Sequence, residues 1–156
     1  MFSVVPRDSL LYPFVPATMQ IQSGQTVLLT GASGGLGIFM ARAFAKMGAS
    51  LALTAFPGVA LEEVRRESEK LGVKAKVFAL DLRDPAQRSQ LIADVRQEFG
   101  SIDILVNNAG VEFTAAYHDI TVENICDSIA GKLEAPMVLS RLVLPEMLSR
   151  KRGHIV

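Results

Sequence analysis

The stretch VLLTGASGGLGIFMARAFAKMG, Val27–Gly48, joins a short apolar run, a cluster of glycines and a segment of small and apolar residues. Val27–Thr30 predicts a buried strand that enters a tight turn, and Leu36–Met47 predicts a helix that Gly48 ends. Glycines in such a turn leave backbone N–H groups unobstructed, and the helix N-terminus adds a partial positive charge. The stretch therefore favours a phosphate-binding loop over a purely structural turn, because it lies between a strong strand and a strong helix.

The rest of the chain alternates between strand and helix patterns, and the expected strands are apolar on both faces. This pattern predicts a doubly wound α/β fold, Rossmann-like, with helices on both faces of a parallel sheet truncated after about five strands. A ligand of such a fold lies beyond the carboxyl ends of the strands. The expected strands are Val27–Thr30, Ser50–Ala55, Lys76–Leu80, Asp103–Asn107 and His154–Val156, and the expected helices are Leu36–Met47, Val59–Leu71, Pro85–Phe99, Val122–Ile129 and Leu133–Arg150.

The chain is expected to hold one domain. Residues 1–23 are predicted to form an irregular N-terminal extension, with Met19 as an alternative start of the protein. The extension lacks a basic region and its apolar stretch is interrupted by prolines, which is not typical of a secretory signal. Residues 24–156 are predicted to be a dinucleotide-binding domain that is incomplete at its C-terminus.

The amino-acid composition indicates which kinds of partner and which cellular compartment to expect. Sixteen basic residues balance sixteen acidic ones, so neither nucleic acid nor a membrane surface is expected as a partner. No apolar run approaches the roughly 20 residues that a membrane-spanning helix needs. The single cysteine, Cys126, fits a reducing compartment, and a cytoplasmic location is expected. His118 and His154 lie far apart without a cysteine or carboxylate pair at metal-ligand spacing, so no metal site is predicted.

Three motifs stand at the ends of expected strands: TGxxxGxG at Thr30–Gly37, DLRD at Asp81–Asp84 and NNAG at Asn107–Gly110. With these motifs the chain resembles the short-chain dehydrogenase/reductase family from about Gln22 to Val156. The resemblance implies an oxidoreductase that transfers hydride between the nicotinamide of NAD or NADP and a carbonyl or alcohol substrate.

The resemblance also implies which residues meet the cofactor. The carboxylate of Asp81 would accept a hydrogen bond from the exocyclic amine of adenine, and the glycine loop would contact the pyrophosphate and the adjoining ribose. The cofactor-binding residues implied in this way are Gly31, Ser33, Gly35, Leu36, Gly37, Asp81, Leu82, Asn108, Ala109 and Gly110.

The choice between NAD and NADP is left open by the sequence. An acidic residue at the end of the second strand binds the ribose 2′-hydroxyl of NAD, whereas a nearby arginine accepts the 2′-phosphate of NADP. This chain has Ala55 at the acidic position, Phe56 at the next, and Gly34 where the loop of many NADP users is basic. The missing acid removes a charge that would repel a 2′-phosphate, which favours NADP slightly.

Two further departures concern catalysis. Relatives usually have Asn where Lys132 stands, and lysine has no acceptor, so Lys132 is either a solvated helix residue or a functional substitute. The family's Tyr-x-x-x-Lys is absent, because Tyr12 and Tyr117 are followed four residues later by Pro16 and Thr121. The catalytic Ser, Tyr and Lys are expected to lie beyond Val156, so no catalytic residue is assigned.

The isolated chain is accordingly expected to bind a dinucleotide without turnover, or to be inactive, and to meet a small-molecule substrate only in a full-length form. The alternatives are a non-catalytic dinucleotide-binding or subunit-contacting module and a non-functional gene remnant. Because the segment Pro136–Pro145 is apolar almost all round, the helix Pro136–Arg150 is the expected contact of an oligomer, as in many relatives.

Overall fold

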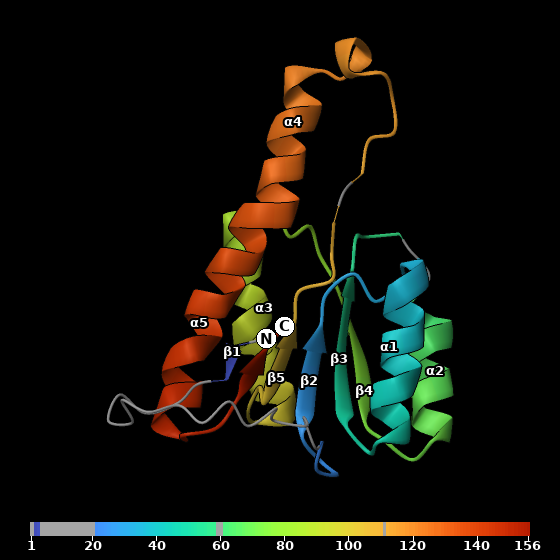
Figure 1. Ribbon diagram of the computed structural model, residues 1–156. Helices are drawn as coiled ribbons and strands as arrows, with labels where there is room; N and C mark the ends of the chain where they lie inside the picture. Colours follow the sequence, from blue (N-terminus) through green and yellow to red (C-terminus); the bar gives the residue numbers. More distant parts are fainter. Residues whose placement is uncertain (1, 4–20, 59–60, 111) are drawn as a thin grey trace.

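The computed structural model describes residues 2–3, 21–58, 61–110 and 112–156. One sheet with the strand order β1-β6-β5-β2-β3-β4 lies between two layers of helices (Figure 1). The strands are β1 (Phe2–Ser3), β2 (Thr26–Leu29), β3 (Ser50–Ala55), β4 (Ala75–Ala79), β5 (Ile104–Val106) and β6 (His154–Ile155). The helices are α1 (Gly35–Lys46), α2 (Glu62–Lys70), α3 (Pro85–Phe99), the short η1 (Tyr117–Asp119), α4 (Val122–Ile129), the π-helix η2 (Ala130–Glu134) and α5 (Ala135–Ser149).

Strands β2 to β6 are parallel to one another, which confirms the expected doubly wound α/β fold. The two-residue strand β1 pairs antiparallel with β6. Before residue 21, the structure describes only residues 2 and 3 of the predicted irregular extension, and these two residues form β1. Met19 lies outside the described residues. The helix expected over Val59–Leu71 begins at Glu62, after its N-cap Leu61, and ends at Lys70. Residues 59 and 60 lie outside the described residues.

The alternation of side chains along the strands produces two separate hydrophobic cores. Val27 and Leu29 of β2 pack with α1 and α2, whereas Leu28 between them packs with α3 and α5. All three side chains are fully buried. The parallel strands are therefore apolar throughout because both of their faces are covered (Figure 1).

Helix ends follow the signals expected from the sequence. The Asp84 carboxylate caps α3 by accepting from the backbone N–H groups of Ala86 and Gln87, and Pro85 occupies the first turn. Gly48 and Gly100 follow α1 and α3 with φ angles of +84° and +82°, a conformation that favours glycine. The Asp84 cap thus ends the connection from β4, and Gly48 and Gly100 begin the connections to β3 and β5.

The prediction of two separate helices over Val122–Ile129 and Leu133–Arg150 was wrong at their junction. The helices α4 and α5 are joined without a break by the π-helix η2. Pro136 explains the wider turn, because proline has no N–H to donate to the carbonyl four residues earlier and its ring would clash with that carbonyl. The resulting long helix carries α4 beyond the carboxyl ends of the strands (Figure 1).

Candidate functional site

A pocket of about 390 Å³ lies at the carboxyl ends of β2, β3, β4 and β5. All of the cofactor-binding residues implied by the sequence motifs line it, from the glycine loop through Asp81 and Leu82 to Asn108, Ala109 and Gly110. The structure thus brings together residues that are up to 79 positions apart, as seen in the hydrogen bond from the backbone N–H of Ala109 to Thr30. The pocket is also lined by Gly34, Thr54, Ala55, Phe56, Leu80, Arg83 and Gly131.

The glycines of the loop differ in what requires them. Gly31 has a φ of +63°, and a Cβ there would stand 2.7 Å from the Cα of Ala109. A Cβ on Gly37 would stand 2.2 Å from the carbonyl oxygen of Gly31. Both distances are too short for a side chain, so packing within the loop excludes one. Among the described residues, no atom lies within 4 Å of a Cβ placed on Gly35, which leaves the space above Gly35 open to a ligand.

The N-terminus of α1 opens onto this space. Gly34 precedes the helix and provides no side-chain cap, and Gly35, Leu36 and Gly37 of the first turn line the pocket. The first N–H groups of a helix have no partner within the helix, and they carry its partial positive charge. Uncapped N–H groups beside an open glycine suit a phosphate, so the residues present fit the pyrophosphate of a dinucleotide.

Thr30 connects the glycine loop to the end of β5. Its Oγ1 donates to the carbonyl oxygen of Val106 at 3.1 Å and accepts from the backbone N–H groups of Asn108 at 2.9 Å and Ala109 at 3.0 Å. The Nδ2 of Asn108 donates to the carbonyl oxygens of Thr30 at 3.1 Å and Gly31 at 3.0 Å. Asn108 therefore braces the glycine loop, and the Thr of TGxxxGxG is part of the same network.

The carboxylate of Asp81 is held by Arg83 of the same DLRD motif. The Nε of Arg83 donates to Oδ1 at 3.0 Å and its Nη2 donates to Oδ2 at 2.8 Å, while its backbone N–H donates to Oδ1 at 2.9 Å. The hydrogen bonds from Arg83 lower the pKa of the Asp81 carboxyl below its ordinary value. Asp81 is thus ionised and oriented at the rim of the pocket.

Arg83 also links this rim to α4, a role that motif reasoning missed. Its Nη1 donates to Oδ2 of Asp127 on α4, and its guanidinium lies 5.6 Å from the centre of the Phe56 ring. Phe56 is 54% exposed and lines the pocket directly after β3. The only sequence signal for Arg83 was its position in DLRD, because its partners Phe56 and Asp127 come from distant segments.

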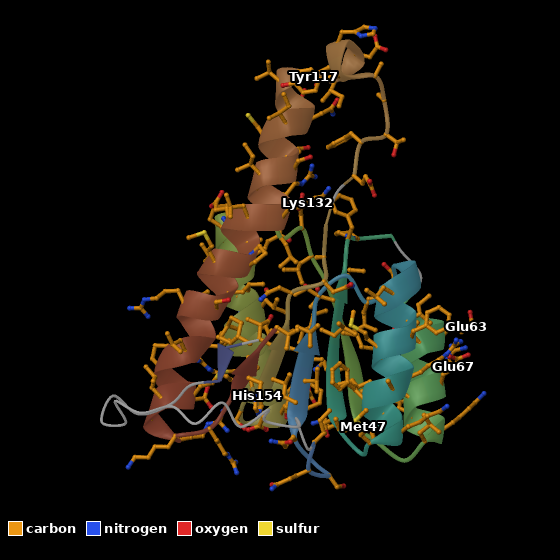
Figure 2. The ribbon with its side chains drawn as sticks, viewed as in Figure 1. Met47, Glu63, Glu67, Tyr117, Lys132 and His154 are labelled. Carbon is orange, nitrogen blue, oxygen red and sulfur yellow. The ribbon has the colours of Figure 1, made fainter. Side chains whose placement is uncertain are left out.

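Lys132 lies in the π-helix next to Gly131, but is not among the residues that line the pocket. Its side chain extends from the helix toward the loop after β5 (Figure 2), where a Cβ on Gly110 would lie 3.4 Å from its Cε. Neighbouring Gly131 lines the pocket, and Glu134 at the end of the π-helix accepts from the buried Arg88 of α3 at 2.6 Å. The stem of Lys132 is therefore packed against the NNAG motif, while the residue as a whole is exposed.

The tyrosine and the potential metal ligands in the described part of the chain do not form a further site. Tyr117 is 81% exposed and lies at the far end of the arm formed by η1 and α4, away from the sheet (Figure 2). Among the residues that the structure describes, no three His, Cys, Asp or Glu side chains come together as metal ligands. Within the same ranges, no helix combines the length and apolar character required to cross a membrane.

The sequence matches the short chain dehydrogenase family over residues 25–156. The chain is 37% identical over 138 residues to the ketoacyl reductase HetN of Nostoc sp., an alignment that covers 88% of this chain and 48% of that protein. It is 34% identical over 149 residues to 17-beta-hydroxysteroid dehydrogenase 13 of Rattus norvegicus, covering 96% of this chain and 50% of that one. The chain thus spans about half the length of these relatives.

Solved structures agree with the sequence matches. A metagenomic short-chain oxidoreductase in complex with NADP superposes with a TM-score of 0.80 at 38% identity, covering 85% of this chain and 61% of that one. A putative short-chain alcohol dehydrogenase of Sinorhizobium meliloti superposes with the same TM-score at 32% identity, covering 86% and 53%. From its fold, its motifs and these similarities, the chain belongs to the short-chain dehydrogenase/reductase family.

Proposed function

We propose that this chain provides the dinucleotide-binding part, residues 24–156, of an NAD(P)-dependent short-chain oxidoreductase. The observation that carries the proposal is the pocket at the carboxyl ends of the strands, where an uncapped helix N-terminus faces the open space above Gly35. The matched relatives are named as a reductase and a dehydrogenase, which supports the same reaction class. When bound, the nicotinamide supplies or accepts the hydride exchanged with a carbonyl or alcohol.

The residues of this chain would bind and orient the cofactor. The first turn of α1, with Gly35, Leu36 and Gly37, would donate backbone N–H groups to the pyrophosphate. Asp81 would accept from the adenine amine, since its carboxylate is ionised. On the other side of the pocket, Asn108 would keep the glycine loop against β5, so that the phosphate site is formed before the ligand arrives.

The cofactor that we propose is NADP in preference to NAD. Ala55 leaves the end of β3 without the carboxylate that would bind the 2′-hydroxyl of NAD and repel a 2′-phosphate. The similar metagenomic oxidoreductase was solved with NADP, which supports the same preference.

The 156-residue chain is proposed to bind the dinucleotide without turning over a substrate. Neither tyrosine of its sequence begins a Tyr-x-x-x-Lys motif, and Tyr117 is not among the residues that line the pocket. A small-molecule substrate would then be bound only by a full-length form. We also propose a cytoplasmic location, since the single cysteine fits a reducing compartment.

A subunit-contacting role is the second candidate, and exposed apolar side chains on the long helix favour it. Ile129, Leu133 and Met137 are each more than half exposed and follow one another at spacings of four residues, so they share one helix face. A second copy or a related subunit would cover this face. Met137→Lys should then lower the oligomeric state in sedimentation velocity, whereas a wild-type chain that sediments as a monomer would contradict this role.

A binding titration tests the proposed function directly. Purified chain is added to NADPH while the nicotinamide fluorescence is recorded, and ADP-ribose is then added as a competitor that carries the adenosine and pyrophosphate but no nicotinamide. Saturable enhancement reversed by ADP-ribose is expected. A folded chain that gives no saturable change would contradict the proposal and favour a non-functional remnant.

A further inference from the structure

Two charged side chains line the pocket among the described residues, Asp81 and Arg83. The other lining residues are glycines, apolar side chains and neutral polar groups. A dinucleotide carries two negative charges on its pyrophosphate, and the helix N-terminus of α1 is available for these. A further anionic group on the ligand would have to meet Arg83, the one cation among the described residues that line the pocket.

Arg83 follows β4 in the sequence, but its guanidinium lies next to the residue that follows β3. In dinucleotide-binding folds the end of the strand that follows the glycine loop lies beside the ribose 2′ position. Here this strand is β3, which ends at Ala55 and is followed by Phe56. The guanidinium of Arg83 comes from the end of β4, yet it stands over the Phe56 ring. The structure thus delivers an arginine to a place where the local sequence, Ala55-Phe56, has none.

The hydrogen bonds of Arg83 leave donors for a ligand. Nε and Nη2 donate to the carboxylate of Asp81, and Nη1 donates to Asp127. A guanidinium has five N–H groups, of which Nη1 and Nη2 carry two each. The second N–H on each of these nitrogens has no acceptor within the described part of the chain, so a phosphate can be bound without breaking the pair with Asp81.

We propose that Arg83, whose guanidinium lies over the Phe56 ring just after β3, is the residue through which this chain recognises the 2′-phosphate of NADP. This inference rests on the proposed function, because it assumes that a dinucleotide occupies the pocket. Asp127 competes with the phosphate for the same guanidinium, whereas Asp81 holds the guanidinium in place through Nε and Nη2. The 2′-substituent is therefore recognised from β4 and not from β3 or the glycine loop.

The experiment compares two fragments that differ only at the 2′ position, adenosine 2′,5′-bisphosphate and AMP, by calorimetric titration. Arg83→Met keeps most of the side-chain stem and removes the charge. Its affinity for the bisphosphate should fall by at least about tenfold, while its affinity for AMP changes less than about threefold. Arg66→Met, on the exposed side of α2 and outside the pocket, is the matched control and should leave both affinities unchanged.

Asp127→Asn tests the same contact in the opposite direction. Removing the competing carboxylate should raise the affinity for the bisphosphate relative to AMP by about threefold or more. This gain is measurable even if Arg83→Met is too unstable to purify.

Three results would overturn the inference. The ratio of the two affinities would be unchanged in both variants, or Arg83→Met would weaken both ligands equally, or Asp127→Asn would lower the bisphosphate affinity. Each leaves the proposed function intact as long as AMP binds. A folded wild-type chain that binds neither fragment would instead overturn the proposed function, and with it the inference.

Discussion

The Cα of Ala109 approaches Gly31 so closely that a Cβ on Gly31 would stand 2.7 Å from it. The turn after β2 and the NNAG motif after β5 are therefore in direct backbone contact. This contact, with the Thr30 hydrogen bonds beside it, forms the floor of the pocket. A change at Gly31 must disturb both segments at once.

Gly31→Ala should lower the free energy of unfolding by about 2–4 kcal/mol, because it combines an unfavourable φ with a clash against backbone. Gly72→Ala is the matched control, since Gly72 has a φ of +84° but a Cβ there would meet none of the described residues within 4 Å. That variant should lose only about 1 kcal/mol, the cost of the backbone conformation alone. Urea denaturation measures both values, and equal losses would show that the contact with Ala109 is unimportant.

Gly35→Ala should separate binding from stability. The methyl group would meet no atom within 4 Å in the described part of the chain, and alanine favours a helix more than glycine does. The free energy of unfolding should therefore stay equal or rise slightly. NADPH binding should weaken by at least about tenfold, since the methyl group occupies the space proposed for the pyrophosphate. Gly24→Ala lies outside the pocket and should show the opposite pattern, a loss of stability at unchanged affinity.

Two threonines with buried hydroxyls should respond differently to valine. Thr30→Val removes an acceptor from the N–H groups of Asn108 and Ala109 and should lower the free energy of unfolding by about 2 kcal/mol. Thr54 is as buried, yet its Oγ1 has no hydrogen-bond partner among the described residues, so Thr54→Val should be neutral or stabilising. Thermal unfolding of the two variants checks this, and a larger loss for Thr54→Val would refute it.

The pH dependence of stability should include a contribution from Glu98. Lys74 and Lys76 bind its carboxylate and lower its pKa from 4.5 to about 2. Because the pKa is lower in the folded state, the stabilisation is fully present above pH 4.5 and is lost as the pH falls toward 2. Glu98→Gln should thus be less stable than wild type at pH 7, and the difference should shrink between pH 4.5 and 2.

Chemical denaturation at a series of pH values measures this difference. Glu63→Gln, on the outer face of α2 (Figure 2), controls for the loss of one negative charge. A Glu98→Gln effect that is the same at pH 7 and at pH 2.5 would mean that the two lysines do not act through the ionised carboxylate.

Most of the fold was predictable because the signals are local. Apolar runs of strand length, Asp84 followed by Pro85, and glycines at helix ends are each determined by neighbours in the sequence. The junction of α4 and α5 was not predictable from the same signals. The π-helix there depends on how a helix accommodates Pro136 while Glu134 pairs with Arg88 of α3, and that pairing comes from tertiary structure.

The residues of the site that belong to sequence motifs were predictable. The glycine loop, Asp81 and NNAG all line the pocket, because each follows a strand of the same parallel sheet. The contacts of Arg83 with Phe56 and Asp127 were missed, since they join three segments whose relative positions no local pattern encodes. The packing of the Lys132 side chain against Gly110 was likewise not predictable, because the two residues are distant in the sequence.

Thr30 is synthesised well before Asn108 and Ala109, its hydrogen-bond partners after β5. A ribosome releases the glycine loop and the first strand–helix–strand unit well before residues 106–109 emerge. Until then Thr30 lacks its partners and β2 has an unpaired edge, where β5 will later insert. A nascent chain therefore carries the glycine loop for some time before it has a binding site, and the dinucleotide cannot assist the first stage of folding.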